Sequence, residues 1–154
     1  MPGAARVLVA EDDRAIARLL QLVLEEEGCQ VDWVREAHEI LPRLQHEQYR
    51  LLILDQIGNH ESELTDAARA LIAEAVRHCP TVIITGRDWA FRLSEQERRT
   101  LARALGLAAI LVKPFDLGDF LRLVHAALDP SQPPSSGSRA HNERGTEQSP
   151  QPSG

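Results

Sequence analysis

The stretch Leu51-Leu52-Ile53-Leu54-Asp55 decides the fold, because four aliphatic residues run without interruption into a carboxylate. Short continuous apolar runs of this kind are typical of strands buried on both faces, as in parallel sheets. Three other stretches are built in the same way: Val7–Ala10 before Glu11-Asp12-Asp13, Val82–Ile84 before Thr85-Gly86, and Ala109–Val112 before Lys113. Cys29–Val34 is a weaker fifth strand candidate.

Helical patterns lie between and after these strands. Asp13 is placed to cap the first helix and Gly28 to end it, while Ser94-Glu95-Gln96-Glu97 forms a capping box for the fourth. Pro42 belongs in the first turn of the second helix or at a kink. The predicted helices cover Ile16–Leu24, Ile40–Leu44, Thr65–His78, Ser94–Gly106 and Leu117–Leu128.

This alternation of strand and helix predicts a single α/β domain with a parallel sheet. In such sheets, ligands bind at the carboxyl ends of the strands. A polar residue follows each of the four clear strands at that end. We therefore expect one cluster at that rim of the sheet, made of Glu11, Asp12, Asp55, Thr85 and Lys113.

Composition limits the class of protein. The polar, Pro/Ser-rich stretch 130–154 cannot bury enough apolar surface to fold, so we expect a disordered tail after one ordered domain. The net charge of −6 then belongs to the domain and argues against nucleic-acid binding. No signal peptide or membrane-spanning stretch is evident, which predicts a cytoplasmic protein, and Cys29 and Cys79 are expected to be reduced structural thiols.

The acidic rim predicts a cation site. Two carboxylates about 4 Å apart repel each other by roughly 4 kcal/mol at an effective dielectric near 20, so clustered acids need a cation or a proton. Mg²⁺ prefers carboxylate, water and phosphate oxygens. Asp55 beside Mg²⁺ could attack phosphorus, with Lys113 and the Thr85 hydroxyl stabilising the phosphoryl oxygens and Gly86 leaving room. Asp13 is better explained as a helix cap.

Lys113 is the only lysine in the chain, against sixteen arginines. An ammonium is a compact charge that reaches a single oxygen, whereas a guanidinium is a wide planar fork. The simple alternative is a lysine that survived by chance on the surface. Its position at the end of an apolar run, directly before Pro114, favours a role in the site.

Taken in order, the motifs Val-Leu-Val-Ala-Glu11-Asp12-Asp13, Leu-Leu-Ile-Leu-Asp55, Val-Ile-Ile-Thr85-Gly86 and Leu-Val-Lys113-Pro114-Phe115 resemble the response regulator receiver domain of two-component signalling. The resemblance covers residues 5–128 and implies a flavodoxin-like (βα)5 doubly wound sheet with a cis Lys113–Pro114 peptide. It implies Asp55 as phosphoacceptor and a histidine kinase or histidine phosphotransfer protein as donor. Its Mg²⁺ ligands would be Glu11, Asp12, Asp55 and the backbone carbonyl of Ile57.

Three stretches depart from the family pattern. The loop Gln56–Ser62 lacks the usual Met-Pro-Gly type of turn, and Ile110 replaces the aromatic switch residue expected three positions before Lys113. The segment Arg87–Leu93 is extra and lacks helical periodicity, so we expect a loop that moves on phosphorylation. Its Trp89 and Phe91 either anchor a partner or pack back onto the domain.

Several functions stay open at this stage. No output module follows Asp129 in this sequence, so the leading expectation is a stand-alone receiver that docks to an unknown protein target. A receiver-like scaffold that works without phosphorylation is the main alternative. A Mg²⁺-dependent phosphatase of the haloacid dehalogenase type would need a second Asp at position 57, where this chain has Ile57.

Overall fold

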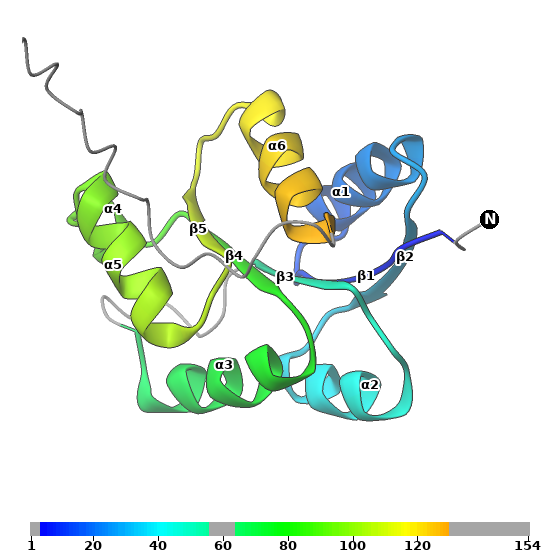
Figure 1. The fold of residues 1–154 in the computed structure, drawn as a ribbon, viewed down its shortest axis with the longest axis horizontal. Helices are drawn as coiled ribbons and strands as arrows, with labels where there is room; N and C mark the ends of the chain where they lie inside the picture. Colours follow the sequence, from blue (N-terminus) through cyan, green and yellow to red (C-terminus); the bar gives the residue numbers. More distant parts are fainter. Residues whose placement is uncertain (1–3, 56–63, 130–154) are drawn as a thin grey trace, which may run out of the picture.

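The computed structural model describes residues 4–55 and 64–129. They form the expected α/β fold, with a five-stranded, all-parallel sheet in the order β2-β1-β3-β4-β5 (Figure 1). The strands are β1 Arg6–Ala10, β2 Gln30–Val34, β3 Leu51–Asp55, β4 Thr81–Thr85 and β5 Ala109–Val112. The expectations for the loop Gln56–Ser62 and for the tail 130–154 fall outside the described residues.

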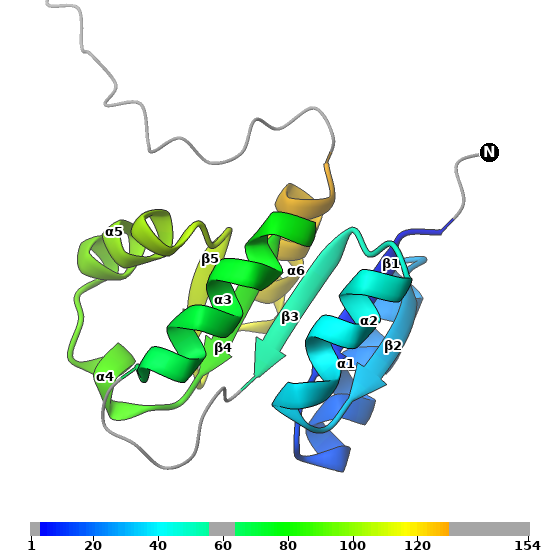
Figure 2. The same cartoon turned by 90° about the horizontal axis from the view of Figure 1, so that it is seen from below.

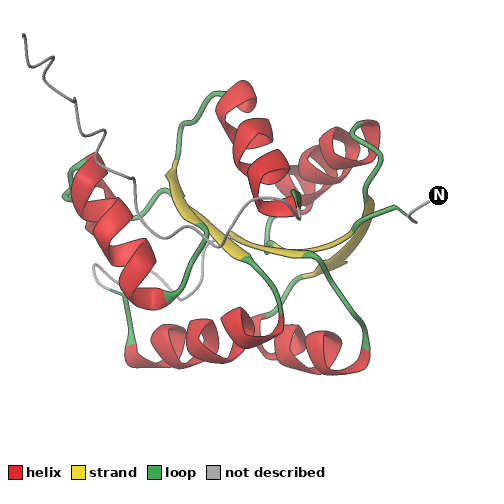
Figure 3. Cartoon of the chain, viewed as in Figure 1, coloured by secondary structure: helices red, strands yellow, loops and turns green. Residues whose placement is uncertain are grey.

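Helices cover both faces of the sheet (Figure 3). Helices α1 and α6 lie on one face, and α2 and α3 lie side by side on the other, as the view from below shows (Figure 2). The helices are α1 Arg14–Glu26, α2 Ile40–His46, α3 Asp66–His78, α4 Asp88–Phe91, α5 Glu95–Leu105 and α6 Leu117–Leu128, with a 3-10 turn, η1, at Ala37–Glu39.

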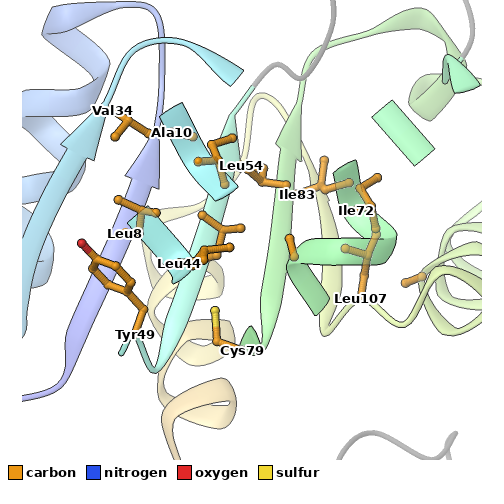
Figure 4. Close-up of a cluster of buried hydrophobic side chains, with 14 residues drawn as sticks. Leu8, Ala10, Val34, Leu44, Tyr49, Leu54, Ile72, Cys79, Ile83 and Leu107 are labelled. Carbon is orange, nitrogen blue, oxygen red and sulfur yellow. The ribbon is translucent and has the colours of Figure 1, made fainter. Parts of the chain in front are cut away.

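The core is divided by the sheet into two apolar layers. The strands β3 and β4 are buried at every position, because both of their faces are covered. On the α2 and α3 side, Leu8, Leu54 and Ile83 from adjacent strands gather with Leu44 and Ile72 (Figure 4). The opposite layer packs the other faces of the same strands against Leu20, Leu24, Phe120 and Val124 of α1 and α6.

The helix ends follow the local sequence signals. The Asp13 carboxylate accepts the N–H groups of Ala15 and Ile16 at 2.8 and 3.2 Å, which satisfies donors that the first helical turn leaves free. Gly28, with φ of 87°, turns the chain into β2. Ser94 Oγ accepts the Glu97 N–H at 3.1 Å, and Pro42 lies in the first turn of α2.

One expectation about the fold is wrong. The segment 87–93 was predicted to be a loop, yet Asp88–Phe91 forms the one-turn helix α4. Four residues are too few to show helical periodicity. Backbone bonds such as Arg92 N–H to the Asp88 carbonyl form the turn, and Arg98 Nη1 of α5 donates to the Leu93 carbonyl at 2.9 Å just after it.

A polar cluster holds the edge strand β2 at the end opposite to the predicted site. Arg6 Nη2 contacts Asp32 at 2.7 Å and Glu47 at 2.6 Å, and its guanidinium lies 5.2 Å from the centre of the Tyr49 ring. The Tyr49 hydroxyl lies 2.6 Å from the same Asp32 oxygen. Burial alone would raise the pKa of Asp32, but the bonds from Tyr49 and Arg6 and the charges of Arg6 and Arg43 outweigh it, so the pKa falls below 3.8.

Candidate functional site

The carboxyl edge of the sheet brings together the polar residues that follow the strands. The strand register places Ala10 beside Leu54 and Thr85 beside Val112, so the residues after β1 and β5 flank those at the ends of β3 and β4. Glu11, Asp55 and Thr85 are 1%, 4% and 2% exposed. Buried polar side chains need hydrogen-bond or ion-pair partners, so the partners of Glu11, Asp55 and Thr85 define the site.

Asp55 is paired with the lone lysine. Lys113 Nζ lies 2.8 Å from Asp55 Oδ1, and the carboxylate is wholly buried whereas the lysine side chain is 22% exposed. This contact is an ion pair and not a hydrogen bond, and neither oxygen of Asp55 has a hydrogen-bond partner among the described residues. A buried carboxylate with free lone pairs is poised to react or to bind a cation.

Glu11 lies against Asp55. Burial raises the pKa of Glu11 to about 9, helped by the close approach of the Asp55 carboxyl and by the negative charge of Asp55, although the bond from the Asp13 N–H to Glu11 Oε1 at 2.9 Å opposes the rise. Asp12 contributes in the same direction. At neutral pH and without a cation, a proton therefore relieves the repulsion between the two buried acids.

The donor set fits a hard divalent cation. Glu11 Oε2 and both Asp55 oxygens are buried without hydrogen bonds, and carboxylate oxygens are the ligands that Mg²⁺ prefers. Asp12, the third predicted acid, is exposed beside them. Within residues 4–55 and 64–129, no three side chains are already gathered as a metal site. The fourth predicted ligand, the carbonyl of Ile57, is outside the described residues.

Thr85 and Lys113 are joined through the backbone. The Lys113 N–H donates to the Thr85 carbonyl at 2.8 Å, and the Lys113–Pro114 peptide is cis as the resemblance implied. The Thr85 hydroxyl accepts the Arg87 N–H at 3.1 Å and so keeps its own proton to donate. A methyl group at Gly86 would lie 3.7 Å from Lys113 Cβ, an ordinary contact, so this glycine leaves space beside the lysine.

The residues that depart from the family pattern belong to β5 and α4. Ile110 is half-buried and packs against the apolar layer of α2 and α3. Phe91 is 54% exposed, while Trp89 is half-buried. Of the two alternatives for these aromatic residues, Phe91 fits a residue that is free to contact a partner, and Trp89 fits one that is partly packed against its own domain.

Sequence reasoning missed one residue that touches the site. Trp33 of β2 donates its indole N–H to the backbone carbonyl of Glu11 at 2.8 Å. Its only signal in the sequence was its place in the weakest strand candidate. The contact depends on the pairing of β2 with β1, which puts Trp33 beside Val9.

A comparison with protein families identifies the chain. Residues 7–125 match the model of the response regulator receiver domain, and the chain belongs to this family. It is therefore a protein of two-component signal transduction, and a histidine kinase is implied as its partner in general terms. Receiver domains typically bind Mg²⁺ and are non-enzymatic apart from their own phosphotransfer.

Individual relatives agree with this assignment. The chain is 30% identical over 128 residues to the phosphate regulon transcriptional regulatory protein PhoB of Rhizobium meliloti (strain 1021), covering 83% of this chain and 54% of that protein. The chain spans about half the length of the curated relatives it matches.

Solved structures share the fold. A CheY-like receiver domain protein from Methanospirillum hungatei JF-1 has a TM-score of 0.65 at 24% identity, over 82% of this chain and 95% of that one. A response regulator receiver protein from Burkholderia phymatum has a TM-score of 0.61 at 26% identity, over 80% and 94%. None of the helices in the described part of the chain is long and apolar enough to cross a membrane.

Proposed function

We propose that this receiver domain accepts a phosphoryl group on Asp55 from a histidine kinase or histidine phosphotransfer protein, with Mg²⁺, and signals by docking to a protein target. The observation that carries the proposal is the state of Asp55. It ends the central strand β3 and is buried, and among the described residues its two oxygens make no hydrogen bond and Lys113 is the cation paired with it.

The neighbouring residues suit such a transfer. A carboxylate oxygen of Asp55 attacks phosphorus while the bond from phosphorus to the donor's histidine nitrogen breaks. Lys113 already lies at Asp55 and can neutralise charge on a phosphoryl oxygen, and the Thr85 hydroxyl can donate to another. Glu11, Asp12 and Asp55 would hold Mg²⁺, which supplies further positive charge to those oxygens when bound.

Acetyl phosphate with Mg²⁺ tests the proposal without knowledge of the kinase. Intact-protein mass spectrometry should show one added phosphoryl group on the wild type and none on Asp55→Asn. Asp119→Asn is the matched control, since this exposed residue of α6 is not among the acids of the predicted site. Equal labelling of the Asp55→Asn variant would refute Asp55 as the acceptor.

Ile110 favours a second candidate function. It holds the position of the aromatic switch residue, and an aliphatic side chain packed against the core cannot perform an aromatic rotation. A receiver that serves as a scaffold for another protein without phosphorylation would need no such switch. Unlabelled wild-type protein in the acetyl phosphate experiment, together with a target bound equally with and without a donor, would support this alternative.

A further inference from the structure

Among the residues that the structure describes, Trp33 is the one outside the acidic cluster whose side chain donates a hydrogen bond to the backbone of that cluster. Its indole Nε1 lies 2.8 Å from the Glu11 carbonyl oxygen, a normal hydrogen-bond distance. The indole is half-buried and packs against the apolar layer of α1 and α6. The ring is therefore fixed by packing, and its N–H is aimed at one acceptor.

The turn after β1 is held at three points. The Glu11 N–H donates to the Val34 carbonyl at 3.1 Å, and the Glu11 carbonyl accepts the Trp33 indole N–H. Two residues after Glu11, the Asp13 N–H donates to the Glu11 carboxylate at 2.9 Å, and the Asp13 side chain caps α1. Asp12 lies between these fixed points, and the peptide unit that leads into it is the one Trp33 holds.

The hydrogen bond from Trp33 can fix the orientation of the Glu11–Asp12 peptide, an effect that apolar packing of the ring alone would not have. Rotation of the Glu11–Asp12 peptide would move the Asp12 carboxylate relative to the buried Glu11 and Asp55. A cation held by these acids requires their oxygens to converge, so free rotation at this peptide weakens binding. The bond from Trp33 opposes that rotation before any cation arrives.

We infer that Trp33 is a positioning residue for the divalent-cation site, acting through its indole hydrogen bond to the Glu11 carbonyl. This inference rests on one part of the proposed function, the binding of the ion by Glu11, Asp12 and Asp55. Trp33 acts on the backbone rather than on the ion. Loss of one neutral hydrogen bond of this kind corresponds to about a fivefold weaker affinity.

The test uses Mn²⁺ as the probe, because it shares the oxygen preference of Mg²⁺ and its free concentration is read by electron paramagnetic resonance. Trp33→Phe keeps an aromatic ring but lacks the N–H. Trp89→Phe is the matched control, the same exchange made in α4. We expect Trp33→Phe to weaken Mn²⁺ binding about fivefold and Trp89→Phe to leave it unchanged.

A second measurement leaves Trp33 intact. In ¹⁵N-labelled Trp89→Phe protein, Trp33 is the only indole, and its N–H resonance should shift as Mg²⁺ is added. Hydrogen exchange at the Asp12 and Asp13 amides should be faster in metal-free Trp33→Phe than in Trp89→Phe, while exchange in β3 and β4 stays equal. A merely structural loss would speed exchange in those strands as well.

The outcomes separate this inference from the proposed function. Equal Mn²⁺ affinity in the two variants, or an indole resonance unmoved at saturating Mg²⁺, overturns the role of Trp33 and leaves phosphorylation of Asp55 standing. If the wild type binds Mn²⁺ normally but is not labelled by acetyl phosphate, the proposed function is overturned and the role of Trp33 still stands. A wild type that binds no Mn²⁺ overturns the inference.

Discussion

At the scale of single residues, the ammonium of Lys113 is the part of the site that an arginine cannot copy. It reaches Asp55 Oδ1 at 2.8 Å from a side chain that is mostly covered. A guanidinium keeps the charge but needs a wider slot. We expect Lys113→Arg to be labelled by acetyl phosphate yet to lose the change in hydrogen exchange over residues 86–93 that labelling causes in the wild type.

Two controls make this prediction specific. Arg99→Lys makes the reverse exchange on the exposed face of α5 and should behave as the wild type does. Lys113→Ala should lose the response too, because it lacks the charge altogether. A Lys113→Arg protein with the full wild-type exchange response would show that the site does not select a narrow cation.

The buried acids predict a stabilising effect of Mg²⁺. Glu11 and Asp55 are buried together, and a proton on Glu11 relieves their repulsion when no cation is bound. A cation that binds only the folded chain raises the free energy of unfolding, by about 1.4 kcal/mol at ten times its dissociation constant. Thermal melts should therefore shift upward by a few degrees in millimolar Mg²⁺.

Asp12 decides whether that shift comes from this site. Asp12→Ala should abolish the shift, because the exposed Asp12 is the acid that can close over an ion at the buried pair. Asp119→Ala removes an exposed acid from α6 and should keep the shift. A response to Mg²⁺ in Asp12→Ala equal to that of the wild type would place the ion elsewhere.

The sequence predicted the meeting of the site residues but not their contacts. Each of Glu11, Asp55, Thr85 and Lys113 ends or follows an apolar run, and parallel strands bring such ends together whatever lies between them. The bond from Trp33 to Glu11 has no comparable signal, because it depends on the register of β2 and on a ring orientation. The roles of these residues in phosphotransfer stay predictions.

At the scale of elements, the edge strand β2 is held by a polar clamp that should depend on pH. The Tyr49 hydroxyl contacts Asp32 at 2.6 Å and Glu47 at 2.8 Å, and Tyr49 is almost wholly buried. Tyr49→Phe removes these bonds and should lower the free energy of unfolding by about 1–2 kcal/mol at neutral pH. Urea unfolding followed by far-ultraviolet circular dichroism measures the loss.

The sign of the pH effect follows from Asp32. Its pKa in the folded chain lies below 3.8, so its bonds stabilise the fold fully above that value and less as the pH falls below it. The difference between the wild type and Tyr49→Phe should shrink below about pH 4. Arg43→Ala, which removes a looser contact at 3.9 Å, should cost less than about 0.5 kcal/mol. A Tyr49→Phe difference independent of pH would contradict the clamp.

Elements with strong local signals were predicted well, whereas the one-turn helix α4 was not. The apolar runs and the caps at Asp13, Gly28 and Ser94 mark their elements because the responsible interactions lie within a few residues. Helix α4 has no such signal. It is one turn long, and its C-terminal side is tied by Arg98, five residues further along the chain from Leu93.

At the scale of the whole molecule, we predict that the signal travels from the site to the surface through β4 into α4. Thr85 ends β4, and its hydroxyl accepts the Arg87 N–H at the start of α4. Phosphorylated Asp55 would draw this hydroxyl inward as a donor and so break its bond to Arg87. Because Arg98 holds Leu93 at the far side, we expect the change to be confined to residues 86–93.

The exposed face of this segment is where a target would sense the change. Phe91 is already largely exposed, and the half-buried Trp89 can become either more or less exposed. Beryllofluoride, a phosphoryl mimic, should shift the Trp89 indole N–H resonance and change hydrogen exchange across residues 86–93. Thr85→Ala, which lacks the hydroxyl, should bind the mimic without these responses. The protein has two tryptophans, and the indole N–H resonances of Trp33 and Trp89 are observed separately in the same spectrum.

This last prediction distinguishes α4 from the other surfaces around the site. Ile110 excludes an aromatic rotation at β5. The Lys113 N–H is bonded to the Thr85 carbonyl, so a signal that leaves through β5 should change hydrogen exchange in β5 and β4 together. If it leaves through α1 instead, exchange should change at residues 14–20 while residues 86–93 stay constant. That second pattern would refute α4 as the moving element, because the break of the Thr85–Arg87 bond must expose the amide at Arg87 to exchange.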